Sequence, residues 1–148
     1  MHAVNLLVST LLATTAVYAV PTNEMTVHMD VSKIGQQVDD YNCKAAPECS
    51  STPNLFQDCV NAMNSLNPNI TYESNQANPN PSTSKAGACS GHCGIFVSST
   101  NTQLTCQVKG DSLKLFGEFI VNHGCPNCGQ FTWAGEQCAV QRAYLAQC

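Results

Sequence analysis

Hydrophobic side chains recur at helical spacing in two parts of the chain, and each part has residues suited to the start of a helix. A helix is predicted over about 53–66, because the Ser-Thr-Pro segment at 51–53 is typical of a helix start. Its apolar face is formed by Leu55, Phe56, Cys59, Val60, Met63 and Leu66. A second helix is predicted over about 112–123, with Ser112 as its cap and Gly124 as its left-handed end. Its apolar face is formed by Leu113, Phe116, Ile120 and Val121.

Alternation of apolar and polar residues indicates strands elsewhere. The region 93–108 contains two alternating runs around a polar turn at 98–102, which predicts a β-hairpin. The apolar positions of these runs are Ile95 and Val97, then Leu104, Cys106 and Val108. The stretch 67–84 is rich in Asn, Ser and Pro and predicts a loop, with one candidate short strand at 70–72. The last segment, 138–148, fits a helix by propensity and a strand by alternation.

The N-terminal part of the chain has the pattern of an exported protein. Residues 1–19 lack Asp, Glu, Lys and Arg, are largely apolar, and place the small residues Val17 and Ala19 where signal peptidase requires them. We therefore expect a signal peptide that is cut after Ala19. The polar segment 20–40 precedes the first cysteine and predicts a flexible leader or propeptide, which leaves 41–148 as the domain.

Export would place the chain in an oxidising compartment where proteins are also glycosylated. An even number of cysteines in such a chain favours about five disulfides over free thiols. The ten cysteines are Cys43, Cys49, Cys59, Cys89, Cys93, Cys106, Cys125, Cys128, Cys138 and Cys148. Asn69 begins the sequon Asn-Ile-Thr and is a candidate glycosylation site.

Charge and hydropathy exclude two broad classes of protein. With Lys+Arg 6 against Asp+Glu 10, the formal net charge is −4, and nucleic acid binding requires clustered basic residues instead. After the signal peptide, no run approaches the ~18 consecutive apolar residues needed to cross a bilayer. We therefore expect a released protein that does not bind nucleic acid.

The segment Cys125-Pro126-Asn127-Cys128 has the Cys-x-x-Cys form of thiol oxidoreductases. Redox dithiols lie at the start of a helix, where the helix dipole lowers the thiol pKa. This segment follows the end of the predicted helix at 112–123, so its context favours a structural role.

Zinc is a second possibility, because Cys89-x3-Cys93 and Cys125-x2-Cys128 have ligand-like spacing, with His92 and His123 close by in the sequence. In an exported chain, however, these thiols meet the disulfide-forming machinery first. His92 is then expected to be a turn residue, and His123 a cation at the end of a helix.

Other catalytic chemistry lacks a motif in this sequence. There is no Gly-x-Ser-x-Gly segment, and the acidic residues are scattered without a pair suited to acid and base catalysis. The single tryptophan, Trp133, is a candidate anchor for a partner, with burial in the core as the alternative. We expect a protein that is not an enzyme.

The sequence Val-Asn-His-Gly-Cys-Pro-Asn-Cys-Gly at 121–129 resembles the killer toxins encoded by viruses of smut fungi, in particular their ten-cysteine, single-chain type. The match centres on Asn-His-Gly-Cys-x-x-Cys-Gly. Other positions that agree are Asn42-Cys43 with Cys49, Ala88-Cys89-Ser90-Gly91, Trp133-Ala134-Gly135, and Tyr144 before Cys148. Together these matches cover about 41–148.

The resemblance implies an α+β fold, an α/β sandwich in which an antiparallel sheet is covered on one face by two antiparallel helices. It favours a strand for 138–148. It also implies that Cys43 and Cys49 are joined to Cys125 and Cys128. The pairing of the other six cysteines is left open, because the family has a cysteine in the first turn of the second helix and this chain has none.

The resemblance also implies an activity at the membrane of a target cell. In the family, a lysine just before the cysteine that Cys89 resembles is thought to block calcium channels. The nearest lysine here is Lys85, four residues upstream, and it is the candidate activity residue. The alternative is that Lys85 is a solvated loop charge without a partner.

These observations lead to one principal hypothesis, a secreted, monomeric, killer-toxin-like protein of a fungus without cofactor or metal. It would be an antifungal or host-directed effector whose partner is a target-cell surface or a membrane channel protein. The alternatives are a secreted thiol oxidoreductase or other small enzyme, and a structural protein associated with the cell wall.

Overall fold

The computed structural model describes residues 25–30, 32, 34–43, 46–74 and 85–148, and the expected signal peptide at 1–19 lies outside this part of the chain. The described residues form an α+β fold with two sheets. Its strands are β1 (Met25–Met29), β2 (Val38–Asn42), β3 (Thr71–Glu73), β4 (Gly87–Ser90), β5 (Cys93–Ser99), β6 (Leu104–Lys109), β7 (Gly129–Trp133) and β8 (Cys138–Tyr144). Its helices are α1 (Ile34–Gln37), α2 (Glu48–Ser51), α3 (Leu55–Ser65) and α4 (Gly110–Asn122).

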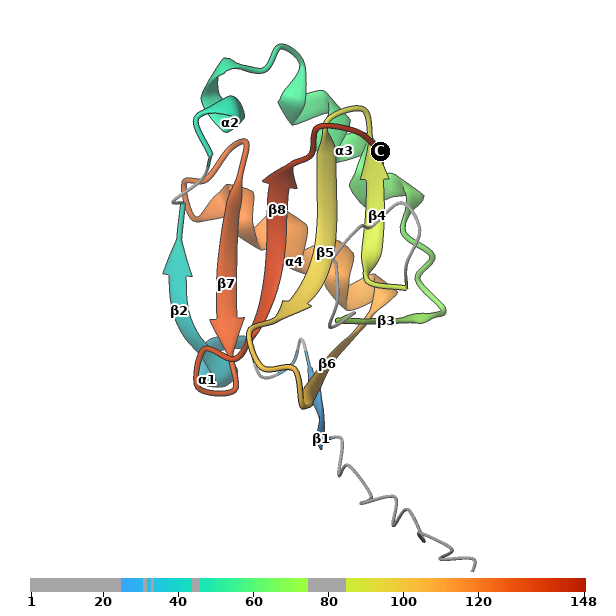
Figure 1. The fold of residues 1–148 in the computed structure, drawn as a ribbon, viewed down its shortest axis with the longest axis vertical. Coiled ribbons are helices and arrows are strands. Elements are labelled where there is room, and N and C mark those ends of the chain that lie inside the picture. The colour runs from blue at the N-terminus through green and yellow to red at the C-terminus, as the bar shows by residue number, and fades with distance from the viewer. Residues whose placement is uncertain (1–24, 31, 33, 44–45, 75–84) are drawn as a thin grey trace, which may run out of the picture.

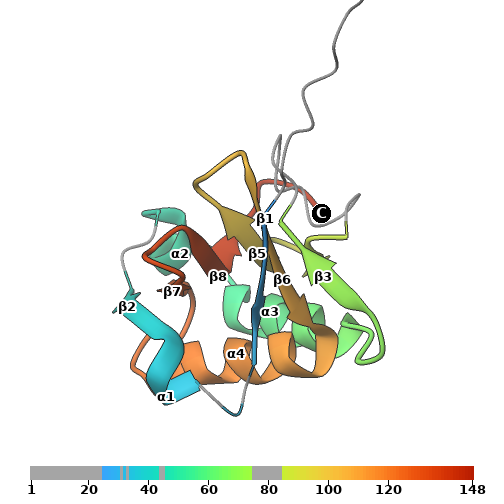
Figure 2. The ribbon, with the colours of Figure 1, turned by 90° about the horizontal axis from the view of Figure 1, so that it is seen from below.

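The larger sheet has five strands in the order β2-β7-β8-β5-β4, and all neighbouring strands are antiparallel. Figure 1 shows α3 and α4 behind this sheet, and Figure 2 shows both helices on the same side of it. The helices approach closely at Gly117, where a Cβ atom would lie 2.6 Å from the Met63 sulfur. Both predicted helices are confirmed, as are the strand in the last segment and the short strand near residue 71.

The core fills the space between the larger sheet and the two helices. Alternate side chains of the strands point to the same face, so that Ile95, Val97, Phe131 and Val140 are all buried. Phe116 of α4 meets Phe131 edge to face, with ring centroids 4.8 Å apart. The apolar stripes of the helices and the alternating positions of the strands thus form one layer.

The predicted hairpin within 93–108 is wrong, although both of its strands exist. β5 pairs with β8 and β4, whereas β6 pairs with β1 and β3 in a separate three-stranded sheet. In the connection between β5 and β6, the Asn101 Nδ2 group donates a hydrogen bond to Gln137 Oε1 at 2.8 Å. Gln137 lies in the turn before β8. β5 and β6 do not pair with each other, and both have partners that are distant in the sequence. Alternation alone does not reveal which strand will be the partner.

The segment 20–40, expected to be a flexible leader, contributes strands where the structure describes it. β1 pairs in parallel with β6, and β2 pairs antiparallel with β7. The hydroxyl of Tyr41 donates a hydrogen bond to the carbonyl of Ile120 at 2.5 Å, which fastens β2 to α4. The ordered domain therefore begins before residue 41, and it has two sheets, one of them mixed, in place of the single antiparallel sheet that was expected.

Four disulfides cross-link these elements, namely Cys43–Cys125, Cys49–Cys128, Cys59–Cys93 and Cys106–Cys138. The first two confirm the pairing that the resemblance implies, and they tie the segment around α2 to the connection between α4 and β7. The last joins β6 to β8 and therefore connects the two sheets covalently.

Removal of the Cys43–Cys125 disulfide should lower the free energy of unfolding by roughly 3 kcal/mol, because the intact Cys49–Cys128 bond lies next to it and leaves a loop of only about ten residues for it to close. Cys43→Ser combined with Cys125→Ser removes it without leaving an unpaired thiol. Urea unfolding can be followed by the fluorescence of Trp133, the single tryptophan, which is 2% exposed. An unchanged unfolding midpoint in the double variant would contradict this prediction.

Candidate functional site

Lys85, the candidate activity residue, lies at an edge of the larger sheet. It is exposed, it precedes β4 by two residues, and its backbone carbonyl accepts a hydrogen bond from the amide of Glu73 at 2.8 Å. β4 is the last strand in the sheet order. Within the described residues the one ion pair joins Lys109 and Asp111 at 3.6 Å, so the Lys85 ammonium has no carboxylate partner there.

Cys89 and Cys148 lie outside the four disulfides, so the expectation that all ten cysteines are oxidised differs from the structure. Cys89 belongs to β4, Cys148 is the final residue, and the Cys148 thiol donates a hydrogen bond to the carbonyl of Cys93 at 3.5 Å. Partial burial of the thiol, with the neighbouring Cys89 and Asp58 as smaller causes, raises the pKa of Cys148 to about 12. Cys148 is therefore protonated at neutral pH, unlike an activated cysteine, whose pKa is lowered.

The turn beside these thiols is held by Asp58 of α3. The Asp58 carboxylate accepts a hydrogen bond from the backbone amide of His92 at 3.0 Å. The His92 ring stacks on Tyr144 with centroids 5.8 Å apart, and its Nδ1 lies 3.3 Å from the carbonyl oxygen of Leu145. His92 is thus a turn residue, as predicted, and its contacts hold the end of the chain next to the turn that follows β4.

The Cys-Pro-Asn-Cys segment does not form a redox pair, because Cys125 and Cys128 are each bonded to a cysteine outside the segment. A redox dithiol cycles between two thiols and a disulfide within the pair. The same disulfides, with that of Cys93, remove thiolates that zinc would need. Within the described residues, no group of three or more His, Cys, Asp or Glu side chains could hold a metal ion. The segment serves as a double attachment point.

The other residues singled out in the sequence lie on separate elements. His123 ends α4, and its Nδ1 lies 2.9 Å from the carbonyl oxygen of Phe119. Trp133 is buried in β7, so it is a core residue and not an exposed anchor. Asn69 is exposed between α3 and β3, where its side chain is accessible to glycosylation.

The sequence analysis missed Arg142, which is 0% exposed in β8. Side chains two residues apart in a strand share a face, so Arg142 lies on the same face as the core residue Val140. Its Nε donates to the carbonyl of Asn127 at 3.0 Å, whereas both terminal nitrogens are buried without a hydrogen-bond partner. The alternation of Val140 and Arg142 is the signal that could have placed this cation in the core, had a strand been assigned from the residues alone.

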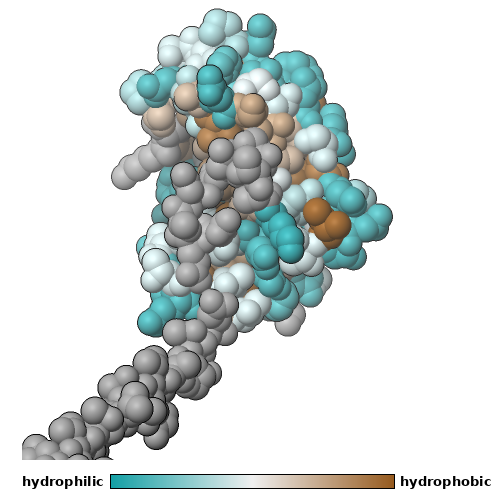
Figure 3. Space-filling model, turned by 45° about the vertical axis from the view of Figure 1, so that its right-hand side comes forward, coloured by the Kyte–Doolittle hydropathy of each residue, from teal (hydrophilic) through white to brown (hydrophobic). Residues whose placement is uncertain are grey.

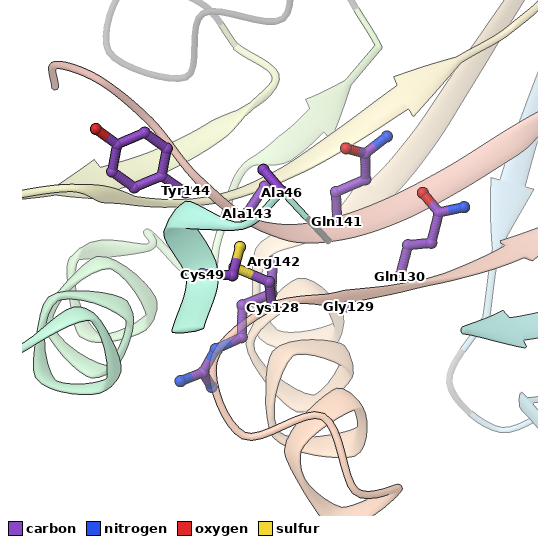
Figure 4. Close-up of a pocket in the computed structure, with 9 residues that line it drawn as sticks. All are labelled: Ala46, Cys49, Cys128, Gly129, Gln130, Gln141, Arg142, Ala143 and Tyr144. Atoms are coloured by element: carbon purple, nitrogen blue, oxygen red, sulfur yellow. A yellow bond between two sulfur atoms is a disulfide. The ribbon is translucent and has the colours of Figure 1, made fainter. Parts of the chain in front are cut away.

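Figure 4 shows that the Arg142 side chain points away from Gln130 and Gln141. Those glutamines line a cavity of about 160 Å³ beside the Cys49–Cys128 disulfide. On the opposite side, the ring of Phe56 lies 5.2 Å from the Arg142 guanidinium carbon. Burial lowers the pKa of Arg142 to about 10, so the guanidinium is still charged at neutral pH.

Among the described residues, few large hydrophobic side chains are exposed. Figure 3 shows one face on which hydrophilic residues occupy most of the rim and hydrophobic residues gather toward the centre. The large hydrophobic residues that are exposed lie on different parts of the chain, and they are Met25, Phe56, Ile70 and Leu115. In the part of the chain that the structure describes, no helix has the length and apolar character to cross a bilayer.

Secreted protein should contain a fifth disulfide between Cys89 and Cys148. These are the two cysteines outside the four disulfides, and the Cys148 thiol is hydrogen-bonded to the carbonyl of Cys93 on β5, the strand that pairs with β4 at Cys89, so an oxidising compartment favours their joining. Digestion without reduction, followed by mass spectrometry, should yield the corresponding cross-linked peptide. Cys148→Ser is the control and should leave one titratable thiol. Two free thiols in unfolded, secreted wild-type protein would contradict this prediction.

Comparison of the chain with models of known protein families and with curated proteins finds no match. The resemblance to the smut-virus killer toxins therefore depends on the short motifs quoted above and on the structural features that agree with them. Those features are the helices behind the larger sheet and the two disulfides at the Cys-Pro-Asn-Cys segment.

Proposed function

We propose that this chain is a secreted, killer-toxin-like protein, a non-enzymatic antifungal or host-directed effector that acts at the surface of a target cell. The observation that carries the proposal is the pair of disulfides Cys43–Cys125 and Cys49–Cys128. Ten cysteines allow many pairings, and the resemblance singled out this attachment of the start of the domain to the Cys-x-x-Cys segment.

The arrangement of the larger sheet also supports the proposal. Its strands are antiparallel, and α3 and α4 lie on one of its faces, which agrees with an α/β sandwich of the killer-toxin kind. The smaller sheet, β1-β6-β3, would be an addition to that plan. Disulfides form and persist in oxidising environments, so their presence supports export.

The partner proposed is a membrane channel or another protein of the target-cell surface, contacted through the sheet edge at Lys85. An exposed cation can approach a vestibule lined by carboxylates, and complementary charges favour that encounter. The net charge of −4 would oppose attraction at long range. The contact at Lys85 would therefore act at short range and weaken as salt rises.

Lys85→Gln should reduce the inhibition of growth and of calcium uptake several-fold in sensitive fungal or plant cells at low ionic strength. The physical reason is the loss of one attractive charge at the point of contact, and moderate salt should narrow the difference between the variant and the wild type. Dose-response curves at the two salt concentrations measure both effects. Lys109→Gln is the matched control, since it removes an exposed cation that already pairs with Asp111.

Two results would count against the proposal at different levels. Equal potency of wild type and Lys85→Gln at both salt concentrations would remove the charge-based contact. Absence of any effect of the wild-type protein on growth or calcium uptake, over a panel of fungal and plant cells, would contradict the effector function itself.

A further inference from the structure

A groove of about 400 Å³ lies between α3 and α4, on the side of the larger sheet where Arg142 is buried. Its apolar walls come from Phe56, Val60 and Met63 of α3 and from Val121 of α4. Arg142 also lines it, entering from β8 beneath the helices. The volume falls in the range of roughly 300–1,000 Å³ that is common for small-molecule sites.

Arg142 leaves most of its hydrogen-bonding capacity unused in this position. A guanidinium carries five N–H donors, and only Nε has a partner, the carbonyl of Asn127. The cation–π contact with the ring of Phe56 offsets only a part of the cost of burying the guanidinium. Burial of a charge without full pairing costs more than a cation–π contact returns, so Arg142 destabilises the folded protein while the site is without a ligand. An anion that reached the terminal nitrogens would remove that cost.

Other charges around the groove do not neutralise Arg142. Lys114 and Glu118 line it from α4, and both are exposed. The Lys114 ammonium donates to Asn64 Oδ1 at 3.2 Å. Among the described residues, neither Glu118 nor any other carboxylate forms an ion pair with Arg142. With two cations and one carboxylate, the lining has a net positive charge.

Phe56 controls access to the guanidinium. Its side chain is 47% exposed on the first turn of α3, lines the groove and covers Arg142. Rotation of an exposed side chain about its Cα–Cβ bond is fast and requires no change in the backbone. Such a rotation would uncover the terminal nitrogens from the side of the groove.

We propose that this groove binds a small amphiphilic carboxylate, with its carboxylate group on Arg142 and its apolar chain along Val60, Met63 and Val121. A carboxylate presents two oxygens that match the two terminal nitrogens of a guanidinium, which is the preferred bidentate geometry. The apolar walls would contact the chain and exclude water from the ion pair. This site is separate from the sheet edge at Lys85 and does not depend on the effector function.

The proposal is tested by isothermal titration calorimetry, in which decanoate is titrated into the oxidised, secreted protein and the heat of binding is measured. We expect saturable binding of one equivalent and a rise in the unfolding temperature, because a ligand of the native state stabilises it. Decanol has the chain without the charge, and acetate has the charge without the chain. Each should bind at least about tenfold more weakly than decanoate, since each loses one of the two contributions.

Arg142→Met is the decisive variant, because it removes the charge and keeps an unbranched apolar side chain. We expect it to weaken decanoate binding by about tenfold or more. It should fold at least as stably as the wild type without ligand, because replacement of an incompletely paired buried charge by an apolar group is neutral or stabilising. Lys109→Met is the matched control and should change the affinity by less than about twofold, since Lys109 is exposed and does not line the groove.

A second measurement uses only the wild-type protein and therefore does not depend on how the variant folds. In amide and side-chain NMR spectra, decanoate should shift the signals of Phe56, Val60, Val121 and the Arg142 Nε–H group, and leave those near Lys85 unchanged. The proposal would be overturned by any of three results: no saturable binding of decanoate, equal affinity for decanol, or shifts that avoid the groove.

Discussion

Two disulfides, Cys43–Cys125 and Cys49–Cys128, hold the segment between β2 and α3 against the connection between α4 and β7, and the larger sheet depends on them. β2 ends one residue before Cys43, and β7 begins one residue after Cys128. The cross-links therefore lie at one end of the β2–β7 ladder and restrict its register. Because β7 also pairs with β8, this restriction is passed to the centre of the sheet. The helices then cover a surface whose strand order is already set.

The sequence predicted elements whose evidence is local and missed arrangements that depend on distant partners. The apolar stripe from Leu55 to Leu66 was sufficient for α3, because a helix satisfies its own backbone hydrogen bonds. β5 and β6 were recognised as strands, but a strand must pair with another segment, and no local pattern named β8, β1 or β3 as that partner. The strand β1 was hidden in a polar stretch, where only Met25, Val27 and Met29 alternate.

Arg142 illustrates a different limit of sequence reasoning. In a chain with 11% charged residues, a single arginine near the C-terminus has no distinguishing pattern, and its importance comes from where β8 carries it. A fold optimised for stability alone would place an apolar residue there, opposite the helices. Positions that break the rules of core composition are expected at functional sites more often than elsewhere. The groove beside Arg142 is therefore a candidate site that the short motifs of the sequence do not indicate.

The order of the disulfides along the chain has a consequence for proteolysis. A single backbone cut anywhere between Cys59 and Cys93 leaves Cys43, Cys49 and Cys59 on one fragment and all of their partners on the other. Three cross-links would still hold the two fragments together. An extracellular protease that cleaved there would thus produce a two-chain protein instead of releasing a piece, and the cleavage would become visible only after reduction.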